Sequence, residues 1–523
     1  MSQGRHMSEI GFRHFAQRDP HAVAVVEARG PRWSYGRLAG LVYSTARALR
    51  GAGLSVGDAV AIVAPNCAEY LAVYLAAIEA GLYVVPINWH LADGEIAYVL
   101  EDSQAKAVVA HARLGRVRLA ALRRLAADRL AICIGSAPGF AALRELAAAC
   151  APRPIDGPKG RVMAYTSATT GRPKGVLLPL ENADAAVAKT IAWHRSLGIQ
   201  PGEGNVHLCA SMLYHSAPLD GAITALRMGH RVVLADGWQP KTLLALIDRH
   251  RVTTSFMVPA MFVRLLKLAP EIKRRYSTAS LRLVIHGGAP CPADVKREML
   301  EWWGPVISES YGAAEAQGTI ASAAEWLAGP GTVGRPIPGS AVEIVDDAGR
   351  ALPPGEPGRV YLKPFTGDRF AYKGDPERTR ASYRGDFVTV GDVGYLDERG
   401  YLFLCGRRAD LILSSGMNIY PAEIEHVLIR HPAVADCAVV GVPHALLGEV
   451  PKAFVQPMPG VVPGRELTLA LLRFLRARLS PMKLPKRIEY THAIPRDPNG
   501  KLYRRLLREA PEALRREAPE APR

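Results

Sequence analysis

Short apolar stretches that look like strands alternate with helical stretches over much of the chain, and this alternation constrains the fold more than any other feature. A strand is predicted at residues 58–63, a helix at 67–79 and a second strand at 83–87. The pattern returns downstream, with strands at 230–234 and 254–258 separated by a helical stretch. Such strands usually run parallel, because each helix carries the chain back to the same end of the sheet. The sequence therefore predicts an α/β fold with parallel sheets covered by helices.

The order of elements changes near the C-terminus. A glycine-bearing loop at 414–419 leads into a helix that begins at Pro421, a favoured first helical position. Strands at 434–440, 452–456 and 487–491, with a helix among them, predict a compact α+β module. A chain of 523 residues is too long for one simple domain. We therefore predict a large N-terminal domain followed by a small C-terminal one.

The composition excludes several classes of protein. The net charge is +16, but the charges are scattered and no zinc-finger, RNP or helix-turn-helix pattern accompanies them, so nucleic acid is not expected as a partner. The 7 cysteines are widely spaced without a CxxC pair, which indicates reduced thiols in a cytoplasmic protein. The N-terminus has no apolar signal core. The longest apolar run, at 70–87, contains Glu79 and Gly81 and favours a buried helix leading into a strand over a membrane span.

A polar loop stands between two predicted strands, at 161–165 and 176–178. Residues 166–175 read Thr-Ser-Ala-Thr-Thr-Gly-Arg-Pro-Lys-Gly. Backbone N–H groups, short hydroxyl donors and one mobile cation are what a loop needs to wrap a polyphosphate. A flexible linker could have a similar composition, but a lysine framed by proline and glycine between two strands disfavours that alternative. No Gly-Lys-Ser/Thr opens a helix here, so the loop is not a Walker A motif. We interpret it as a nucleotide-phosphate loop of another type.

Other polar residues carry weaker signals when each is considered alone. His215 follows a predicted strand, where a lone histidine is most often structural. Gly287 and Gly288 could let the backbone approach a flat ring closely, or could simply form a turn. The carboxylate of Asp392 could accept both hydroxyls of a ribose. Lys501 lies in a Gly-Lys turn, where a solvated lysine is the default.

Together these motifs resemble the adenylate-forming superfamily, in its acyl-CoA synthetase branch. The resemblance spans about residues 33–506. It rests on motifs that occur in the same order as in the family: the loop at 166–175, the Tyr-His pair at 214–215, the turn at 286–290, Tyr-Gly-Ala-Ala-Glu at 311–315, the hairpin at 391–407 and the turn at 495–502. It implies a multi-sheet N-terminal domain at 1–406 with a small β subdomain, a hinge at 407–410 centred on Ala409, and a mobile lid domain at 411–523.

The resemblance also implies roles for individual side chains. Tyr311 would stack on adenine, and Asp392 would accept hydrogen bonds from the ribose. The nucleotide-binding residues implied by the loop and by three later motifs are Thr166, Ser167, Thr169, Thr170, Gly171, Lys174, Gly288, Ala289, Pro290, Glu309, Ser310, Tyr311, Gly312, Asp392 and Arg407. The acyl group and the thiol would lie against Tyr214, His215, His286, Gly287, Ala313 and Gly416. Catalysis would depend on Lys501, His215 and Glu315, of which Glu315 would hold Mg²⁺.

The implied function is an ATP-dependent acid–thiol ligase that forms an acyl-adenylate and passes the acyl group to coenzyme A. Two residues depart from the family pattern, Ala168 in place of glycine and Ala314 in place of threonine. Both positions belong to motifs that would contact the phosphates, so weak adenylation is expected. One alternative function is therefore a protein that mainly converts a supplied acyl-adenylate to a thioester. Loading of an acyl carrier protein and non-enzymatic binding of an acyl-adenylate are others. The particular acid and the oligomeric state are not revealed by the sequence.

Overall fold

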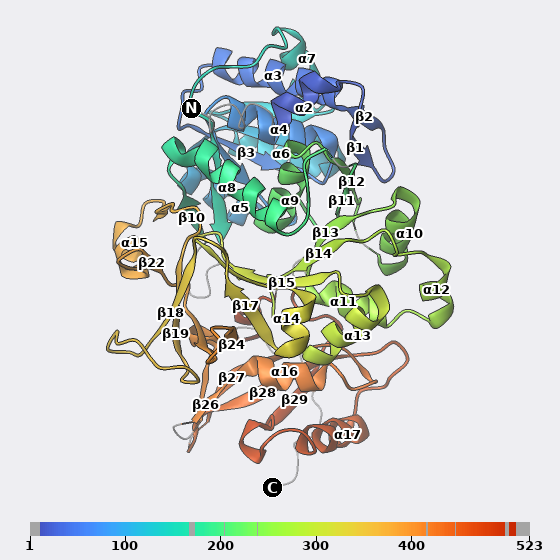
Figure 1. Cartoon of the computed structure of the whole chain (residues 1–523), viewed down its shortest axis with the longest axis vertical. Helices are drawn as coiled ribbons and strands as arrows, with labels where there is room; N and C mark the ends of the chain where they lie inside the picture. Colours follow the sequence, from blue (N-terminus) through green and yellow to red (C-terminus); the bar gives the residue numbers. More distant parts are fainter. Residues whose placement is uncertain are drawn as a thin grey trace.

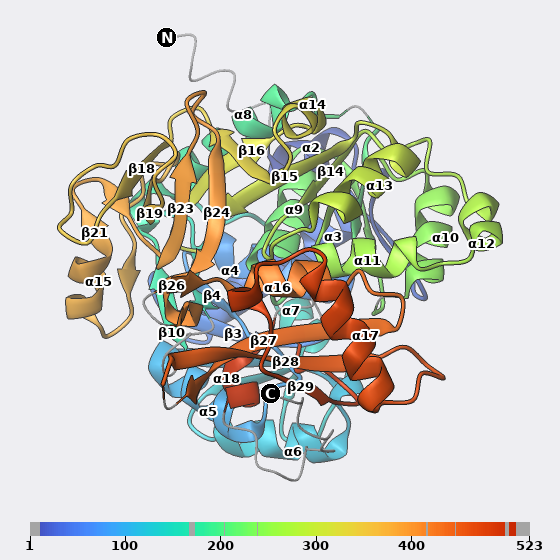
Figure 2. The ribbon, with the colours of Figure 1, turned by 90° about the horizontal axis from the view of Figure 1, so that it is seen from below.

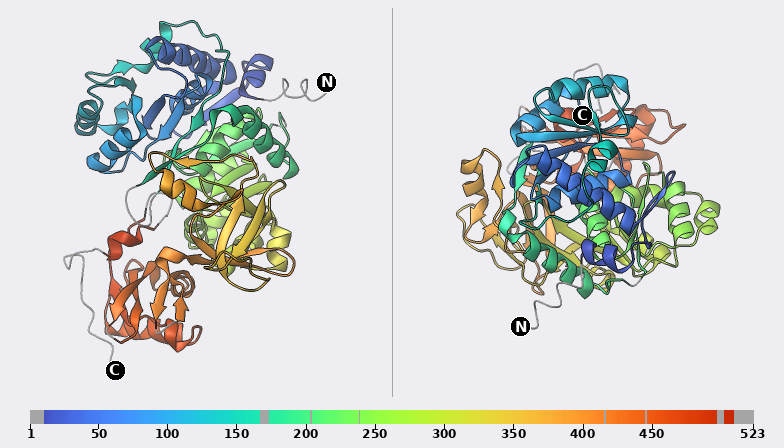
Figure 3. Two further views of the ribbon diagram at one scale, coloured as in Figure 1. Left: turned by 90° about the vertical axis from the view of Figure 1, so that its left-hand side faces the viewer. Right: turned by 90° about the horizontal axis from the view of Figure 1, so that it is seen from above.

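The computed structural model describes residues 11–166, 173–202, 204–237, 239–414, 417–444, 446–496 and 502–508. In Figure 1 the N-terminal segments (blue) lie at the top and the C-terminal segments (orange to red) at the bottom. Seen from the side, the C-terminal part forms a separate lobe below the rest of the chain (Figure 3).

A six-stranded parallel sheet forms the first layer of the N-terminal part. Its strands, in spatial order, are β7 (Ala141–Ala142), β6 (Leu130–Ile134), β5 (Ala105–His111), β3 (Ala59–Val63), β4 (Tyr83–Pro86) and β8 (Arg161–Val162). The associated helices are α3 (Tyr35–Gly51), α4 (Ala68–Glu79), α5 (Asp93–Ser103), α6 (Arg116–Leu125) and α7 (Leu143–Ala148). This is the parallel, helix-covered arrangement that the alternating sequence pattern predicts.

A fifteen-stranded sheet forms the centre of the molecule and changes character along its length. Its parallel part contains β1 (Val23–Glu27), β12 (Arg231–Leu234), β11 (Val206–Cys209), β13 (Thr254–Met257), β14 (Leu283–His286) and β15 (Ile307–Gly312), with β2 (Arg32–Ser34) antiparallel at the edge. Helices of this region are α2 (Phe12–Arg18), α8 (Ala183–Ser196), α9 (Ser216–Arg227), α10 (Pro240–His250), α11 (Pro259–Leu266), α12 (Pro270–Arg275) and α13 (Ala293–Trp303).

Beyond β15 the same sheet continues in antiparallel fashion. This part consists of β16 (Gln317–Ala321), β17 (Thr332–Pro336), β24 (Leu402–Arg407), β23 (Asp392–Leu396), β19 (Gly358–Lys363), β22 (Phe387–Val388) and β21 (Tyr383–Arg384), with β18 (Ala341–Val345) beside β19 and helices α14 (Ala323–Ala328) and α15 (Pro376–Ser382) nearby. A separate three-stranded sheet contains β9 (Ala164–Thr166), β10 (Lys174–Leu177) and β20 (Ala371–Tyr372).

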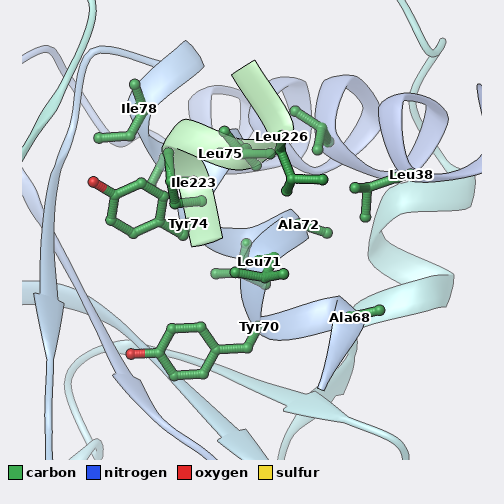
Figure 4. Close-up of a cluster of buried hydrophobic side chains, with 14 of the residues drawn as sticks. Leu38, Ala68, Tyr70, Leu71, Ala72, Tyr74, Leu75, Ile78, Ile223 and Leu226 are labelled. Carbon is green, nitrogen blue, oxygen red and sulfur yellow. The ribbon is translucent and has the colours of Figure 1, made fainter. Parts of the chain in front are cut away.

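The helix α4 is buried along nearly its whole length and packs against α3 and α9 (Figure 4). Its apolar side chains point in every direction because it lies inside the protein, which is why its sequence shows no polar face. It ends at Glu79, and the chain turns at Gly81 into β4. The long apolar run is therefore a buried helix followed by a strand, as predicted. Within the described parts of the chain, no helix is long and apolar enough to cross a membrane.

The C-terminal lobe has its own sheet and its own apolar core. The sheet contains β25 (Ile412–Ser414), β26 (Met417–Ile419), β27 (Val434–His444), β28 (Gly448–Pro457) and β29 (Arg487–Tyr490). Helices α16 (Pro421–Leu428) and α17 (Arg465–Arg476) bury their apolar faces against it, and α18 (Arg504–Arg508) follows. In the view from below, this lobe is drawn in front, with the strands β23 and β24 of the large sheet beside it (Figure 2). The α/β class with a small α+β C-terminal module is thus confirmed, while the hinge role of residues 407–410 stays a prediction.

Candidate active site

The strands that flank the phosphate loop form a tight antiparallel pair. Thr166 at the end of β9 lies opposite Lys174 at the start of β10, so the two ends of the loop are neighbours. The amino group of Lys174 lies 3.7 Å from a carboxylate oxygen of Asp375. The intervening positions, which include Ser167, Ala168, Thr169, Thr170 and Gly171, lie outside the described residues. The framework of the predicted strand–loop–strand is therefore present.

Glu315 is joined to the phosphate-loop strands through one tyrosine. The hydroxyl of Tyr372 donates a hydrogen bond of 2.9 Å to Glu315, and Tyr372 lies in β20, directly opposite Val176 of β10. Glu315 itself is buried. A single buried carboxylate beside the predicted phosphate loop would suit Mg²⁺, because this ion is usually held by one or two carboxylates together with substrate phosphates. Among the described residues there is no group of three or more His, Cys, Asp or Glu side chains that could hold a metal by itself.

Tyr311, Asp392 and Arg407 meet where β15 approaches the hairpin of β23 and β24. The Tyr311 hydroxyl donates to Asp392 over 2.7 Å, and Nε of Arg407 lies 3.2 Å from the other carboxylate oxygen. Asp392 and Arg407 are paired across the hairpin, which fixes their separation. Burial, followed by the charge of Asp392, raises the pKa of Tyr311, so its hydroxyl stays a proton donor. Three side chains predicted to contact the nucleotide are thus brought together.

The turn after β14 lies directly on β15. A Cβ atom at Gly287 would come within 2.6 Å of the Ser310 carbonyl oxygen, so only glycine allows this close approach. Gly288 adopts φ +78°, a conformation that also favours glycine. Ala289 and Pro290 continue the turn. On the next turn, Ala313 donates its N–H to Ala316, and a Cβ at Gly312 would lie 2.7 Å from Gln317 Cα.

His286 and Glu309 are buried in the core. The ring of His286 packs on that of Phe262 at a centroid distance of 5.3 Å. Glu309 accepts a hydrogen bond of 2.9 Å from Lys296, which is completely buried. Burial raises the pKa of Glu309 and lowers that of Lys296, and their mutual attraction opposes both shifts. Lys296 and Glu309 therefore form a buried pair in the core, and the ligand roles expected for His286 and Glu309 stay predictions.

Tyr214 and His215 stand at the entrance to α9. His215 is the residue that precedes the helix, and its ring lies 4.5 Å from that of Tyr214. Tyr214 is buried, and His215 is partly exposed. The predicted aromatic–histidine pair is thus formed at the start of α9, which also forms one wall of a cavity.

A cavity of about 80 Å³ lies along α9, between this helix, α8 and the strands β11, β13 and β14. It reaches Ser310 and Gln317 at the end nearest Tyr311. Its wall includes Ala217, Asp220, Gly221, Thr224 and Ala225 of α9, together with Trp193, His194, Ile199, His207, Met228, His230, Thr254, Ser255, Phe256, Leu283 and Ile285. The α9 residues have the i, i+3, i+4, i+7, i+8 spacing of one helical face.

The sequence reasoning did not identify α9. No helix was predicted between His215 and the strand at 230–234. Pro218 lies in the first helical turn, where the missing N–H would have no partner within the helix. The regular spacing of small and polar residues after His215 was the available signal. Because α9 was missed, its cavity-facing residues were not considered for the acyl pocket.

The segment predicted as a hinge lies between two sets of ion pairs. Arg408 contacts Asp347 of the N-terminal part, while Asp410 lies 3.5 Å from Arg504 and 3.1 Å from Arg508 of α18. Ala409, between them, is exposed. Gly416 and Lys501 lie outside the described residues, although the bridge between Arg496 and Leu502 brackets the turn that carries Lys501.

The fold and these constellations are those of a nucleotide-dependent enzyme, and the family comparison agrees. Residues 12–364 match the model of the AMP-binding enzyme family, and residues 423–501 match the model of its C-terminal domain. The chain therefore belongs to the AMP-binding enzymes, that is, to the adenylate-forming superfamily. Within it, the relatives place the chain in the acyl-CoA synthetase branch of acid–thiol ligases.

The chain is similar over nearly its full length to several characterised proteins. It is 34% identical to a feruloyl-CoA synthase from Amycolatopsis, over 94% of this chain and 96% of that protein. It is 32% identical to the fatty acid–acyl-carrier-protein ligase ScoC of Streptomyces coeruleorubidus, over 94% of each. Among solved structures, the o-succinylbenzoate-CoA synthetase of Bacillus subtilis, in complex with its acyl-adenylate, gives a TM-score of 0.80 at 28% identity, covering 96% of this chain and 98% of that one.

Proposed function

We propose that this enzyme activates a carboxylic acid with ATP as an acyl-adenylate and transfers the acyl group to coenzyme A. The observation that carries the proposal is the convergence of two constellations on the large sheet. Tyr311, Asp392 and Arg407 form one, and Glu315 is tied to the phosphate-loop strands through Tyr372. One offers groups for a ribose and an aromatic base, and the other offers groups for phosphates. The cavity along α9 supplies a place for the acyl group.

In the first step a carboxylate oxygen of the acid attacks the α-phosphorus of ATP. A new C–O–P linkage forms, the bond to the bridging oxygen breaks, and pyrophosphate leaves with the electron pair. Several negative charges meet in this step, so the donors of the loop, Lys174 and Lys501 would stabilise it. Mg²⁺, when bound at Glu315, would neutralise phosphate charge. No covalent enzyme nucleophile is required.

In the second step the thiol sulfur attacks the acyl carbonyl carbon. The thiol proton is released, a thioester forms and AMP leaves. The two steps need different groups near the acyl carbon, namely Lys501 in the first and the loop around Gly416 in the second. Both belong to the C-terminal lobe, so we propose that a rotation about Ala409 exchanges them.

Two departures of this sequence from the family pattern support the proposal that the adenylation step is slow. Ala314 cannot donate the hydrogen bond that a threonine would offer, and a hydrogen bond to a charged group is worth about 1.5–3 kcal/mol. Ala168 adds a methyl group and restricts the backbone in the loop. The expected result is slow exchange of pyrophosphate into ATP, accelerated in the double variant Ala168→Gly, Ala314→Thr. Exchange that is already fast, or that the double variant leaves unchanged, would refute this cause.

The decisive experiment separates the two half-reactions. Acid-dependent exchange of labelled pyrophosphate into ATP measures the first, and release of AMP from a supplied acyl-adenylate in the presence of coenzyme A measures the second. Lys501→Ala should abolish the first and leave the second largely intact. Loss of neither half-reaction in this variant would contradict the proposal.

A carrier-protein thiol is the second candidate acceptor, because one relative, at 32% identity, is named as a fatty acid–acyl-carrier-protein ligase. The test compares coenzyme A and a phosphopantetheinylated carrier protein as acceptors at equal concentration. Acyl transfer to coenzyme A at least ten times faster supports the main proposal, and the reverse ratio supports the alternative.

A further inference from the structure

The cavity along α9 has several polar residues in its wall. It is lined by one carboxylate (Asp220), three histidines (His194, His207 and His230), four hydroxyls (Thr224, Thr254, Ser255 and Ser310) and one amide (Gln317), in addition to its apolar residues. A site for an unbranched alkyl chain needs none of these, because a polar group buried without a partner costs free energy. The polar groups of this wall therefore indicate what the cavity receives.

Some of these groups already have partners within the protein. Ser255 donates to the Leu208 carbonyl over 2.7 Å, and Thr254 lies 3.0 Å from Nδ1 of His207. His194 contacts the Thr190 carbonyl through Nδ1, and His230 contacts the Gln200 carbonyl through Nε2, both over 2.9 Å. These groups are explained by the protein's own structure.

Other groups on the same wall have no hydrogen-bond partner among the described residues. They are Nε2 of His207, Oγ1 of Thr224 and Nε1 of Trp193, all buried. The carboxylate of Asp220 also has no hydrogen bond or ion pair within the described chain, although His194, Arg227 and Arg161 act on it at longer range. Unsatisfied buried polar groups are rare in native proteins, and each one needs an explanation. The four residues that carry these groups line one cavity, and Asp220 is the one among them that is not buried.

The carboxylate of Asp220 is the group on this wall that most requires a hydrogen-bond donor. Burial raises its pKa above the usual range, which shows that the protein does not solvate the carboxylate well. Its side chain is nevertheless partly exposed, and it lines the cavity. A carboxylate can only accept hydrogen bonds, so a ligand that satisfies it must bring an O–H or N–H group.

The position of Asp220 places that donor away from the reacting end. His215 precedes α9, and Asp220 lies five residues further along, which corresponds to about 7.5 Å of helix. Ser310, at the other end of the cavity, is next to Tyr311 of the nucleotide constellation. The cavity volume of about 80 Å³ is smaller than the roughly 150 Å³ cavity that accepts benzene. A long alkyl chain does not fit it.

We propose that the acid activated by this enzyme is compact and carries a hydroxyl or amino group remote from its carboxyl, and that Asp220 accepts a hydrogen bond from that group. The proposal rests on the proposed function, because it assigns the cavity along α9 to the acyl group. Asp220 is thus a specificity-determining residue.

The test uses acids of matched shape that differ in one group. Compact acids of matched length, namely 4-hydroxybutyrate, 4-aminobutyrate and their methyl analogue pentanoate, together with decanoate, are assayed for acid-dependent AMP formation with ATP and coenzyme A. We expect kcat/KM for the best hydroxy or amino acid to exceed that of its methyl analogue at least tenfold. In Asp220→Leu the ratio should fall to one or below, while in Asp248→Leu, a carboxylate replacement on α10 outside the cavity, it should not change.

The outcomes separate this inference from the proposed function. If pentanoate or decanoate is used as well as the polar acids, or if Asp220→Leu keeps the selectivity, the inference is overturned and the ligase activity stands. If no acid gives AMP or pyrophosphate, the proposed function fails and the inference fails with it. Asp220→Asn, which keeps the shape of the side chain and removes its charge, provides a second test if Asp220→Leu does not fold, and it should lower the same ratio.

Discussion

Tyr311 and Asp392, which are far apart in sequence, are joined by a hydrogen bond of 2.7 Å that ties the last parallel strand of the large sheet to the hairpin of β23 and β24. Asp392 receives a second contact from Arg407 at 3.2 Å. The pair is held in place by two independent elements, so the carboxylate has a fixed position before any ligand arrives.

Replacing Asp392 with asparagine should weaken nucleotide binding. The amide keeps the shape but loses the charge that strengthens hydrogen bonds to hydroxyl groups. We expect KM for ATP to rise about tenfold, corresponding to about 1.4 kcal/mol, and the affinity for AMP measured by calorimetry to fall similarly. Asp397→Asn is the control, since Asp397 only stabilises the turn of the same hairpin by accepting from the N–H groups of Arg399 and Tyr401. Equal KM values for ATP in wild type and Asp392→Asn would contradict a ribose-binding role.

Breaking the buried pair of Lys296 and Glu309 should destabilise the protein strongly. In Lys296→Met the Glu309 carboxylate keeps its buried position but loses the cation 2.9 Å away. The expected loss is about 3–5 kcal/mol in the free energy of unfolding, measured with urea. The double variant Lys296→Met, Glu309→Leu should recover most of it, because no charge then remains buried. A double variant as unstable as the single one would show that packing around Lys296, and not the charge, is responsible.

Gly221 should not tolerate alanine, although it lies within a helix. A Cβ at this position would lie 3.0 Å from Nε2 of His207, whose ring is held by Thr254. Alanine normally stabilises a helix interior by about 1 kcal/mol relative to glycine. We expect Gly40→Ala in α3, which has no atom within 4 Å of the added methyl group, to show that gain. Gly221→Ala should show a loss in the same urea titration. A gain in both variants would mean that His207 can move aside.

The stability of the protein should fall as the pH is lowered below 6.5. Burial lowers the pKa of His207 to about 3, whereas a histidine in the unfolded chain titrates near 6.5. Between these values the unfolded state binds a proton that the folded state does not, so the free energy of unfolding decreases by about 1.4 kcal/mol per pH unit for this group. His286 has a pKa lowered in the same direction and adds to the effect. Urea titrations from pH 7 to 4 should give a shallower dependence for His207→Gln than for the surface variant His21→Gln. Identical slopes would exclude His207 as a contributor.

Restricting the segment between the two lobes should affect the half-reactions unequally. In Ala409→Pro the ring fixes one backbone dihedral angle of the turn. If the proposed rotation occurs there, single-turnover experiments should still show one half-reaction at near wild-type rate while the other slows at least tenfold. Ala409→Gly should leave both intact. Equal slowing of both half-reactions in the proline variant would instead indicate a distorted structure.

The elements that could be predicted from the sequence are those with a local signal. The hairpin of β23 and β24 follows from its turn, in which Asp397 accepts the N–H groups of Arg399 and Tyr401. Helix α3 follows from its apolar stripe and from Ser34, whose hydroxyl accepts the Arg37 N–H and caps the helix. The phosphate loop was recognisable because it needs particular residue types between two strands.

The parts that could not be predicted depend on distant contacts. The hydrogen bond between Tyr372 and Glu315 joins residues that are 57 positions apart in the sequence, and no local pattern predicts it. The burial of the His286 and Glu309 side chains depends on strand register, which a single sequence does not fix. The cavity was missed because no helix was predicted between His215 and the strand at 230–234, although the helical spacing of α9 was present.

Ser310 and Tyr311 are consecutive residues of β15, and the first borders the cavity while the second contacts Asp392. Since neighbouring side chains of a strand project to opposite sides, a partition only one backbone thick divides these two compartments. If a ligand on one side displaces that strand, the side chain on the other side moves with it. A poorly seated acid would therefore disturb the nucleotide directly, so that discrimination between acids can be expressed in the rate of the chemical step as well as in affinity.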